Sequence, residues 1–264
     1  VVPWEVVART DIPEGLGTEF EVGARAVAPD DVASLIYTSG TTGTPKGVLL
    51  TQSNFASNVT SCVARLGYRP ADVALSMLPL CHIYERTNAY VYLAYGVSLA
   101  YAESFDTVAQ NLLEVRPTVM ATVPRFFEKL YVRLQDNLRS QPALRQKIFN
   151  WAVAVGRETL PYRLQEKPLP AGLTWRHRLA DWLVYSKIRQ RLGGRMRLII
   201  SGGAPFSREL NQFFQALNVP ILEGYGLTET SPVIAVNVPG ETKPGTVGKP
   251  LPGVEVKIAP DGEI

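Results

Sequence analysis

Cysteine and histidine are scarce in this chain. Its 264 residues include two cysteines, Cys62 and Cys81, and two histidines. So few thiol and imidazole groups cannot build a disulfide framework or a Cys/His zinc site, and the cysteines are expected to stay reduced. The first residues show neither the basic segment nor the cleavage pattern of a secretory signal, so we expect a cytoplasmic protein.

A long hydrophobic run is also missing. The longest apolar stretch, residues 88–102, has about 15 residues, contains Gly96, and lies between Arg86 and Glu103. A membrane-spanning helix needs about 20 apolar residues. We expect this stretch to form a buried helix followed by a strand. With 46% hydrophobic residues, the chain has enough apolar material for a sizeable core.

Acidic residues are few in one long segment. Residues 125–197 hold 16 Lys and Arg but five Asp and Glu, although the whole chain carries a net charge of only +3. A block this basic could attract an anionic partner, or its charges could be no more than the solvated faces of helices.

Short apolar stretches alternate with helical patterns along most of the chain, after a loop-rich lead-in at residues 1–30. Strands are expected at residues 31–37, 48–50, 72–80, 97–102, 118–123, 196–200 and 219–222, and helices at 52–65, between 102 and 117, across 125–191 and at 208–217. This alternation predicts an α/β fold with a largely parallel sheet and flanking helices. Ligands of such sheets bind beyond the carboxyl ends of the strands, where three glycine-rich segments fall.

The last residues have the pattern of a strand and a turn. Val254, Val256 and Ile258 alternate with polar residues, and an Asp-Gly turn pair follows. The returning strand is missing, and an unpaired strand edge is a liability that natural chains avoid. We therefore expect residues 251–264 to be the start of a truncated β subdomain and the chain to be a fragment.

The segment of residues 38–47 has the chemistry of a phosphate-binding loop. Its glycines let the backbone turn tightly and aim N–H groups at an anion, its hydroxyls add donors, and Lys46 adds positive charge. It does not match a Walker loop, because alignment on Gly40 and Lys46 puts Pro45 in place of glycine and Gly47 in place of serine or threonine. A GTPase or Walker-type ATPase is therefore disfavoured, and a flexible hairpin loop is the plainer alternative.

The same segment, with Ile36-Tyr37 before it, resembles the signature loop of the adenylate-forming enzymes, which include acyl-CoA synthetases, luciferases and peptide-synthetase adenylation domains. The resemblance covers residues 30–264 and implies that residues 31–250 form the AMP-binding core of the family's large domain, with residues 125–197 as a basic helical insert. It implies that the phosphates of ATP are bound by Thr38, Ser39, Gly40, Thr41, Thr42, Gly43, Thr44 and Lys46.

Two further segments match the family in the expected order. In residues 223–230 an aromatic ring lies between two glycines and precedes a hydroxyl and a carboxylate. By resemblance, Tyr225 stacks on adenine, Thr228 contacts the α-phosphate and Glu229 binds Mg²⁺, which prefers carboxylate oxygens beside substrate phosphates. Residues 201–205 resemble the adenine-side loop. The implied nucleotide-binding residues here are Gly202, Gly203, Ala204, Glu223, Gly224, Tyr225, Gly226 and Thr228.

Residues 78–86 resemble the segment that long-chain fatty acyl synthetases place beside their acyl tunnel, and residues 123–127 at the start of the insert resemble the same group. His82 would line the approach of acid and thiol, or it is an ordinary hydrogen-bonded histidine at a strand end. The resemblance thus implies a long-chain fatty acid–CoA ligase. Its anionic partner for the basic segment could then be coenzyme A, an acidic acyl carrier protein or a membrane surface that supplies fatty acid. Its implied catalytic residues are Lys46, His82, Thr228 and Glu229. The alternatives are an acyl–acyl carrier protein synthetase, an aryl or amino-acid adenylating enzyme, and a nucleotide-binding module that has lost catalysis.

The family's reaction has two halves. A carboxylate attacks the α-phosphorus of ATP and releases pyrophosphate, and a thiol then displaces AMP from the acyl adenylate. His82 need not act as a base, because the carboxylate is already ionised at neutral pH. The resemblance places the ribose-binding aspartate, the hinge and the C-terminal domain with its catalytic lysine beyond residue 264. We therefore expect the isolated chain to have little or no ligase activity.

Overall fold

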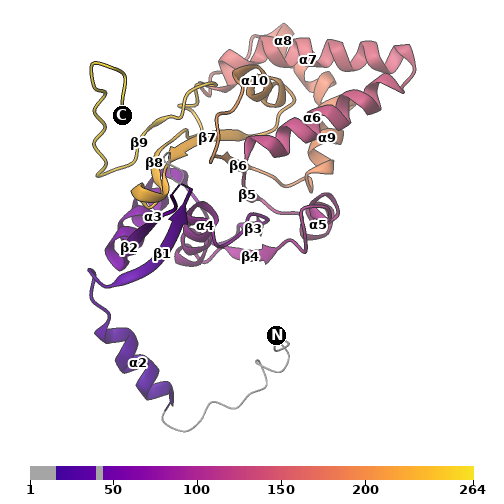
Figure 1. Ribbon diagram of the computed structural model, residues 1–264. Coiled ribbons are helices and arrows are strands. Elements are labelled where there is room, and N and C mark those ends of the chain that lie inside the picture. Colours follow the sequence, from indigo (N-terminus) through magenta and orange to yellow (C-terminus); the bar gives the residue numbers. More distant parts are fainter. Residues whose placement is uncertain (1–15, 40–43) are drawn as a thin grey trace.

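The computed structural model describes residues 16–39 and 44–264 (Figure 1). Its main sheet has seven strands in the order β4-β3-β5-β6-β7-β8-β9. The strands are β3 (Val73–Ser76), β4 (Ser98–Tyr101), β5 (Val119–Thr122), β6 (Leu198–Ser201), β7 (Ile221–Gly226), β8 (Val233–Val236) and β9 (Lys249–Pro250). The neighbouring strands β4, β3, β5, β6 and β7 pair in parallel, and β8 and β9 add an antiparallel edge. The predicted α/β fold with a largely parallel sheet is confirmed.

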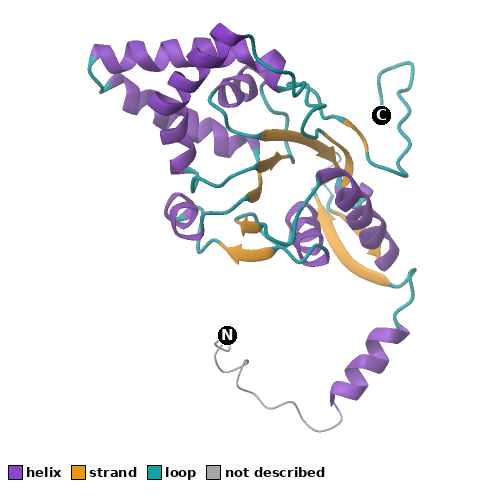
Figure 2. Cartoon of the chain, turned by 180° about the vertical axis from the view of Figure 1, so that it is seen from behind, coloured by secondary structure: helices purple, strands orange, loops and turns teal. Residues whose placement is uncertain are grey.

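Helices cover both faces of this sheet (Figure 2). They are α3 (Gln52–Leu66), α4 (Ile83–Ala94), α5 (Val108–Val115), α6 (Pro124–Arg139), α7 (Ala143–Arg163), α8 (Ala171–Ala180), the π-helical turn η1 (Asp181–Tyr185), α9 (Ser186–Arg191), α10 (Arg208–Ala216) and the 3₁₀ turn η2 (Thr228–Thr230). The expected helices at 52–65, 125–191 and 208–217 are therefore confirmed, as is the helix followed by a strand within residues 88–102.

Alternate residues of each strand feed two separate cores, as a pleated strand requires. One set packs against helices α5 to α8 and α10, and consists of Leu75, Met120, Ile199 and Ile221. The other set packs against α3 and α4, and consists of Ala74, Val119, Leu198 and Leu222. The sheet is thus buried on both sides, which explains why its strands are continuous apolar runs in the sequence.

Helix α3 shows how local sequence sets an element's ends. Thr51 is the N-cap, with φ −87° and ψ 169°, and its side chain accepts a hydrogen bond from the Asn54 amide while the Asn54 side chain accepts one from the Thr51 amide. This reciprocal capping satisfies two amides that the helix itself leaves unpaired. Gly67 ends the helix in the left-handed conformation, with φ +61°. The predicted cap at residues 51–54 is confirmed.

A separate antiparallel hairpin carries the glycine- and threonine-rich segment. It consists of β1 (Val32–Thr38) and β2 (Lys46–Thr51), which pair with each other and not with the seven-stranded sheet. The strand at residues 31–37 was expected to be buried, and that expectation is wrong: Leu35 is 50% and Tyr37 69% exposed. Because the hairpin lies outside the main sheet, one of its faces has no core to pack against. Its loop therefore joins two antiparallel strands rather than extending from a parallel one.

Two other sequence-based expectations also fail. The lead-in at residues 1–30 is not all loop, because α2 (Leu16–Ala26) forms a helix with an acidic residue in its first turn and a basic one in its last, which complement the helix dipole. Residues 254–258 form no strand. The expected turn after them is present, with the Gly262 amide donating to the Ala259 carbonyl at 2.9 Å. A strand pattern without a neighbouring strand to complete its hydrogen bonds stays irregular.

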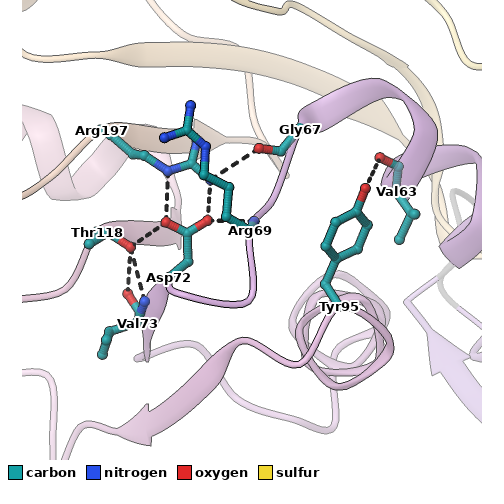
Figure 3. Close-up of polar contacts among 8 residues, drawn as sticks. All are labelled: Val63, Gly67, Arg69, Asp72, Val73, Tyr95, Thr118 and Arg197. Atoms are coloured by element: carbon teal, nitrogen blue, oxygen red, sulfur yellow. Dashed lines mark hydrogen bonds and ion pairs between the residues drawn. The ribbon is translucent and has the colours of Figure 1, made fainter.

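At the amino ends of the parallel strands, a polar network ties three segments together (Figure 3). Arg197 donates from Nε to Asp72 Oδ1 at 2.7 Å and through a second nitrogen to Asp72 Oδ2 and the Gly67 carbonyl. Thr118 and the Arg69 amide also donate to Asp72. Burial opposes ionisation of Asp72, but these donors outweigh it and hold the pKa of its carboxyl below the usual value.

Candidate active site

Buried polar side chains mark the carboxyl ends of the parallel strands. Ser76, Thr122 and Ser201 are the last residues of β3, β5 and β6, and each is at most 3% exposed. Thr122 and Ser201 are direct partners in the β5–β6 ladder, and Ser201 is the partner of Glu223 in β7. The segments that leave these strands therefore start side by side at one edge of the sheet, where ligands of α/β folds bind.

The loop after β6, residues 201–205, lies close to helix α4. The Gly202 amide donates to the Thr122 carbonyl at 3.1 Å. A Cβ atom on Gly202 would lie 3.3 Å from the ring of Tyr84, and Gly203 has φ +79°, a conformation that glycine adopts without strain. Gly203 and Ala204 are exposed. Because the two glycines carry no side chains, this turn packs closely against α4 and its exposed side is accessible to a ligand.

The segment of residues 223–226 was expected to follow strand β7 but forms its last part. The strand continues because Gly224 and Tyr225 pair with β8, and the register shifts between Tyr225 and Gly226. At Gly226 a Cβ atom would lie 1.9 Å from the Pro232 carbonyl oxygen, so no larger residue fits without moving the backbone. Tyr225 is half-buried.

Glu223 is held by the protein itself. Its carboxylate accepts hydrogen bonds from Asn211 Nδ2 at 2.6 Å and from the Gly245 amide at 2.9 Å. Burial raises the pKa of Glu223, and these two donors lower it by less. Asn211 belongs to α10, so the carboxylate faces that helix. Among the predicted nucleotide-binding residues, Glu223 thus has a clear structural role in joining β7 to α10.

The turn after β7 presents Thr228 and Glu229. Thr230 fixes this turn: its hydroxyl accepts from the Leu227 amide at 2.9 Å and donates to the Pro232 carbonyl. Thr228 is half-buried and Glu229 is exposed. In the described part of the chain, Glu229 makes no hydrogen bond or ion pair through its carboxylate.

The surroundings of Glu229 fit a magnesium ion held mainly by substrate. No three His, Cys, Asp or Glu side chains gather into a metal cluster within residues 16–39 and 44–264, so this part of the chain has no all-protein cage for a cation. Mg²⁺ usually keeps several waters and binds through one or two carboxylates together with substrate phosphates. A single free carboxylate near a loop with phosphate-binding chemistry is compatible with this mode of binding.

The hairpin brings the phosphate-type loop to the same region. Thr38 and Lys46 are partners at the end of the β1–β2 ladder, so they form the base of the loop, and both Ser39 and Lys46 are exposed. Strand β2 packs against η2, the turn that contains Thr228 and Glu229. The remaining predicted loop residues include Thr44, which is exposed, whereas Gly40, Thr41, Thr42 and Gly43 lie outside the described residues.

Residues 78–86 connect the hairpin to the sheet. The Tyr84 hydroxyl donates to the Ile200 carbonyl at 3.0 Å, next to the loop after β6. Arg86 donates to the Ser34 hydroxyl of β1 at 2.7 Å and to the Leu80 carbonyl at 3.2 Å. The hairpin therefore contacts α4, and α4 contacts β6, which pairs with β7. The turn η2 after β7 packs on β2 of the hairpin, so these contacts form a closed ring. His82 is exposed as the N-cap residue of α4.

One buried acid near this edge has no role in the sequence-based interpretation. Glu85, in the first turn of α4, is 1% exposed, and neither carboxyl oxygen has a hydrogen-bond partner among the described residues. Burial raises the pKa of Glu85 to about 7, and the neighbouring Ser76 hydroxyl lowers it by less. Glu85 belongs to the segment of residues 78–86 that the sequence singled out, but sequence alone does not tell which way such a side chain points.

Known proteins are similar to this chain in sequence. The chain is 38% identical to long chain acyl-CoA synthetase 6, peroxisomal, of Arabidopsis thaliana over 87% of its own length and 32% of that protein. It is 39% identical to the putative fatty-acid–CoA ligase fadD11 of Mycobacterium tuberculosis over 93% of its own length and 43% of that protein. The chain thus spans less than half the length of these relatives.

A solved structure gives the same result for the fold. The o-succinylbenzoate coenzyme A synthetase MenE from Bacillus subtilis, in complex with AMP, superposes with a TM-score of 0.60 at 25% identity, covering 90% of this chain and 39% of that one. The sequence also matches the family model described as AMP-binding enzyme over residues 5–263. Because this match covers nearly the whole chain, the chain belongs to the AMP-binding enzyme family.

Proposed function

We propose that the protein carrying this chain activates a long-chain fatty acid with ATP and transfers the acyl group to coenzyme A. The observation that carries the proposal is the ring of contacts joining the hairpin, the 78–86 segment and the ends of β6 and β7. The names of the relatives, long-chain acyl-CoA synthetase and fatty-acid–CoA ligase, support the choice of acid and acceptor. In this proposal residues 31–250 are the nucleotide-binding core and 125–197 its basic insert.

The nucleotide is proposed to lie across the carboxyl edge of the sheet. Half-buried Tyr225 would stack on the adenine, and the exposed turn at Gly203 and Ala204 would let the base approach. The hydroxyls and amides of the hairpin loop, with Lys46, would bind the β- and γ-phosphates. Thr228 would donate to the α-phosphate. Glu229 would hold Mg²⁺, whose bound charge offsets that of the phosphates.

The chain's own contribution to the chemistry is positioning and charge stabilisation. The attacking carboxylate is already ionised at neutral pH, so no side chain has to remove its proton. What the site must do is hold the acid in line with the α-phosphorus and donate hydrogen bonds where negative charge builds up. Donors fixed on a strand end and on a packed hairpin are suited to this because they need little rearrangement. His82, exposed at the start of α4, would border the path of the acid and the thiol.

The proposal also names the thiol that accepts the acyl group. Two thiols, those of coenzyme A and of an acyl carrier protein, take part in the same class of reaction. Coenzyme A carries phosphates and an acyl carrier protein is acidic, so the basic segment of residues 125–197 suits both. The relatives' names favour coenzyme A. Competition between the two acceptors in thioester formation by the full-length protein decides between them.

Pyrophosphate exchange by the full-length protein tests the proposed substrate. Exchange should be fastest with a long-chain fatty acid, and Glu229→Gln should slow it by about 100-fold, the usual effect of removing one group that stabilises transition-state charge. Glu128→Gln, on the exposed side of α6, is the matched control and should exchange normally. Preference for benzoate or an amino acid would refute the fatty-acid assignment. Absence of exchange with every acid would instead indicate a module that has lost catalysis.

A further inference from the structure

One continuous helical rod, made of α8, η1 and α9, lies on the outside of the basic segment, and α8 lies at the upper edge of the molecule in Figure 1. Its inner side is apolar and packs on α7. Its outer side carries two large aromatic residues that ordinary globular packing would bury: Trp175 is 66% and Trp182 72% exposed. Three exposed cations accompany them. We call these five residues the tryptophan–cation stripe: Trp175, Arg178, Trp182, Lys187 and Arg191.

A π-helical turn keeps the stripe on one side of the rod. Trp175, Arg178 and Trp182 are spaced by three and four residues, which places them on one helical face. An uninterrupted α-helix would bring residue 186 next to this face, but Ser186 is half-buried and Lys187 is exposed. The extra residue of the π turn at Asp181–Tyr185 accounts for this shift. It also turns Tyr185 fully inward, where its hydroxyl donates to the Ala152 carbonyl at 2.6 Å.

The acidic residues of the rod and of its partner α7 are neutralised by other cations. Asp181 accepts from Arg189 at 2.5 Å and 3.0 Å, and Glu158 of α7 pairs with Arg176 at 2.9 Å. In the described part of the chain, no ion pair involves the three cations of the stripe. The stripe therefore presents uncompensated positive charge beside two exposed indole rings, with Arg178 between the rings and Lys187 and Arg191 beyond Trp182. Helix α5, which packs against α9, carries the exposed acidic residue Glu114.

We propose that the tryptophan–cation stripe docks the protein on an anionic lipid bilayer. Tryptophan rings favour the headgroup level of a membrane, where the apolar ring is covered and the N–H stays near water. Lys and Arg next to them are attracted by the negative surface potential of anionic lipids. Because these five exposed side chains follow one side of a continuous helical rod, they can approach a flat surface together. The proposed fatty-acid substrate, which partitions into bilayers, supplies the reason for such a contact; the contact itself does not depend on that assignment.

Cosedimentation of the full-length protein with vesicles tests this surface. We expect binding to phosphatidylcholine vesicles that contain phosphatidylglycerol and weaker binding to phosphatidylcholine alone. Replacing the three cations by glutamine should weaken partition onto the anionic vesicles about 100-fold, since each cation near the surface contributes about fivefold. The matched control replaces three exposed cations of α6 and α7, Lys129, Arg133 and Lys147, and should change partition much less, because attraction falls off within a Debye length.

The tryptophans provide a second, charge-independent measurement. Trp175→Ala with Trp182→Ala should weaken binding at least about tenfold on both kinds of vesicle, because binding scales with buried apolar area. Equal losses in the stripe and control variants, or no vesicle binding, would overturn the proposal. So would indole rings shielded from acrylamide in the vesicle-free protein, or cation variants that lose binding only to an acidic carrier protein. Omitting ATP and acid keeps the outcome independent of the ligase assignment.

Discussion

Replacing Glu85 by glutamine should abolish a pH dependence of stability that the buried carboxyl imposes. Its pKa is about 7 in the folded protein against an ordinary value of 4.5. A raised pKa means that the folded state holds the proton more tightly than the unfolded chain does. The stabilising contribution is therefore complete below pH 4.5 and is lost as the pH rises through 7.

The size of the effect follows from the two pKa values. A tenfold difference in proton affinity between the folded and unfolded states corresponds to about 1.4 kcal/mol, so the free energy of unfolding should fall by about 2.5 kcal/mol between pH 5 and pH 8 because of Glu85 alone. Glutamine keeps the shape of the side chain without an ionisable group. Glu85→Gln should therefore be clearly more stable than the wild type at pH 8, but not at pH 5.

Chemical denaturation of the full-length protein at several pH values measures this difference. Glu128→Gln removes an exposed carboxyl from α6 and serves as the control. The informative quantity is the difference between each variant and the wild type, in which the titration of all other groups cancels. Parallel stability profiles for Glu85→Gln and the wild type between pH 5 and pH 8 would show that the carboxyl does not stay protonated in the folded state, and the reasoning from its burial would fail.

Three other substitutions distinguish effects on the proposed nucleotide site from effects on the stability of the fold. Gly226→Ala places a methyl group 1.9 Å from the Pro232 carbonyl; we expect a loss of about 2 kcal/mol in stability and a raised KM for ATP, measured by denaturation and by pyrophosphate exchange. Arg86→Gln removes the hydrogen bond from α4 to Ser34 of the hairpin but leaves the apolar cluster of Ile36 and Ile83 in place, and should raise the KM for ATP about tenfold while the melting temperature changes little. Asp72→Asn leaves Arg197 without its partner and should cost about 3 kcal/mol in stability with an unchanged KM for ATP, because the network lies at the opposite edge of the sheet. In the wild type, the contribution of Asp72 should be lost only in acid, as the pH falls through its lowered pKa.

Most of the parallel sheet was predictable because its signals are local and repeated. Strands buried on both faces appear as continuous apolar runs, and the cap at Thr51 and the glycine after α3 mark the ends of a helix directly. Glycine pairs at strand ends likewise identify the turn at residues 202–203. The positions of these segments along one edge follow from the parallel topology, so their proximity was also predictable.

The failures have a common physical origin in pairing partners. Residues 32–38 are as apolar as a core strand, but periodicity does not tell which strand they join, and they pair only within the hairpin. Residues 254–258 alternate as a half-buried strand does, yet a ladder needs a neighbour. Strand β7 extends through Gly226 because β8 pairs with it, a contact made from far along the chain. Arg86 belonged to a recognised segment, but its bond to Ser34 depends on tertiary structure.

Because the hairpin has its own hydrogen-bond ladder, the loop at residues 39–45 can be exchanged without altering the strand pairing of the central sheet. Strands β1 and β2 share no backbone pairing with the seven-stranded sheet and are joined to α4 through the Arg86 side chain. Exchanging the loop for that of another family member would leave every ladder bond of the central sheet in place. Under the proposed function, sequence variation in the loop would change how tightly nucleotide is held while the backbone pairing of the central sheet stays intact, so the two properties can evolve separately.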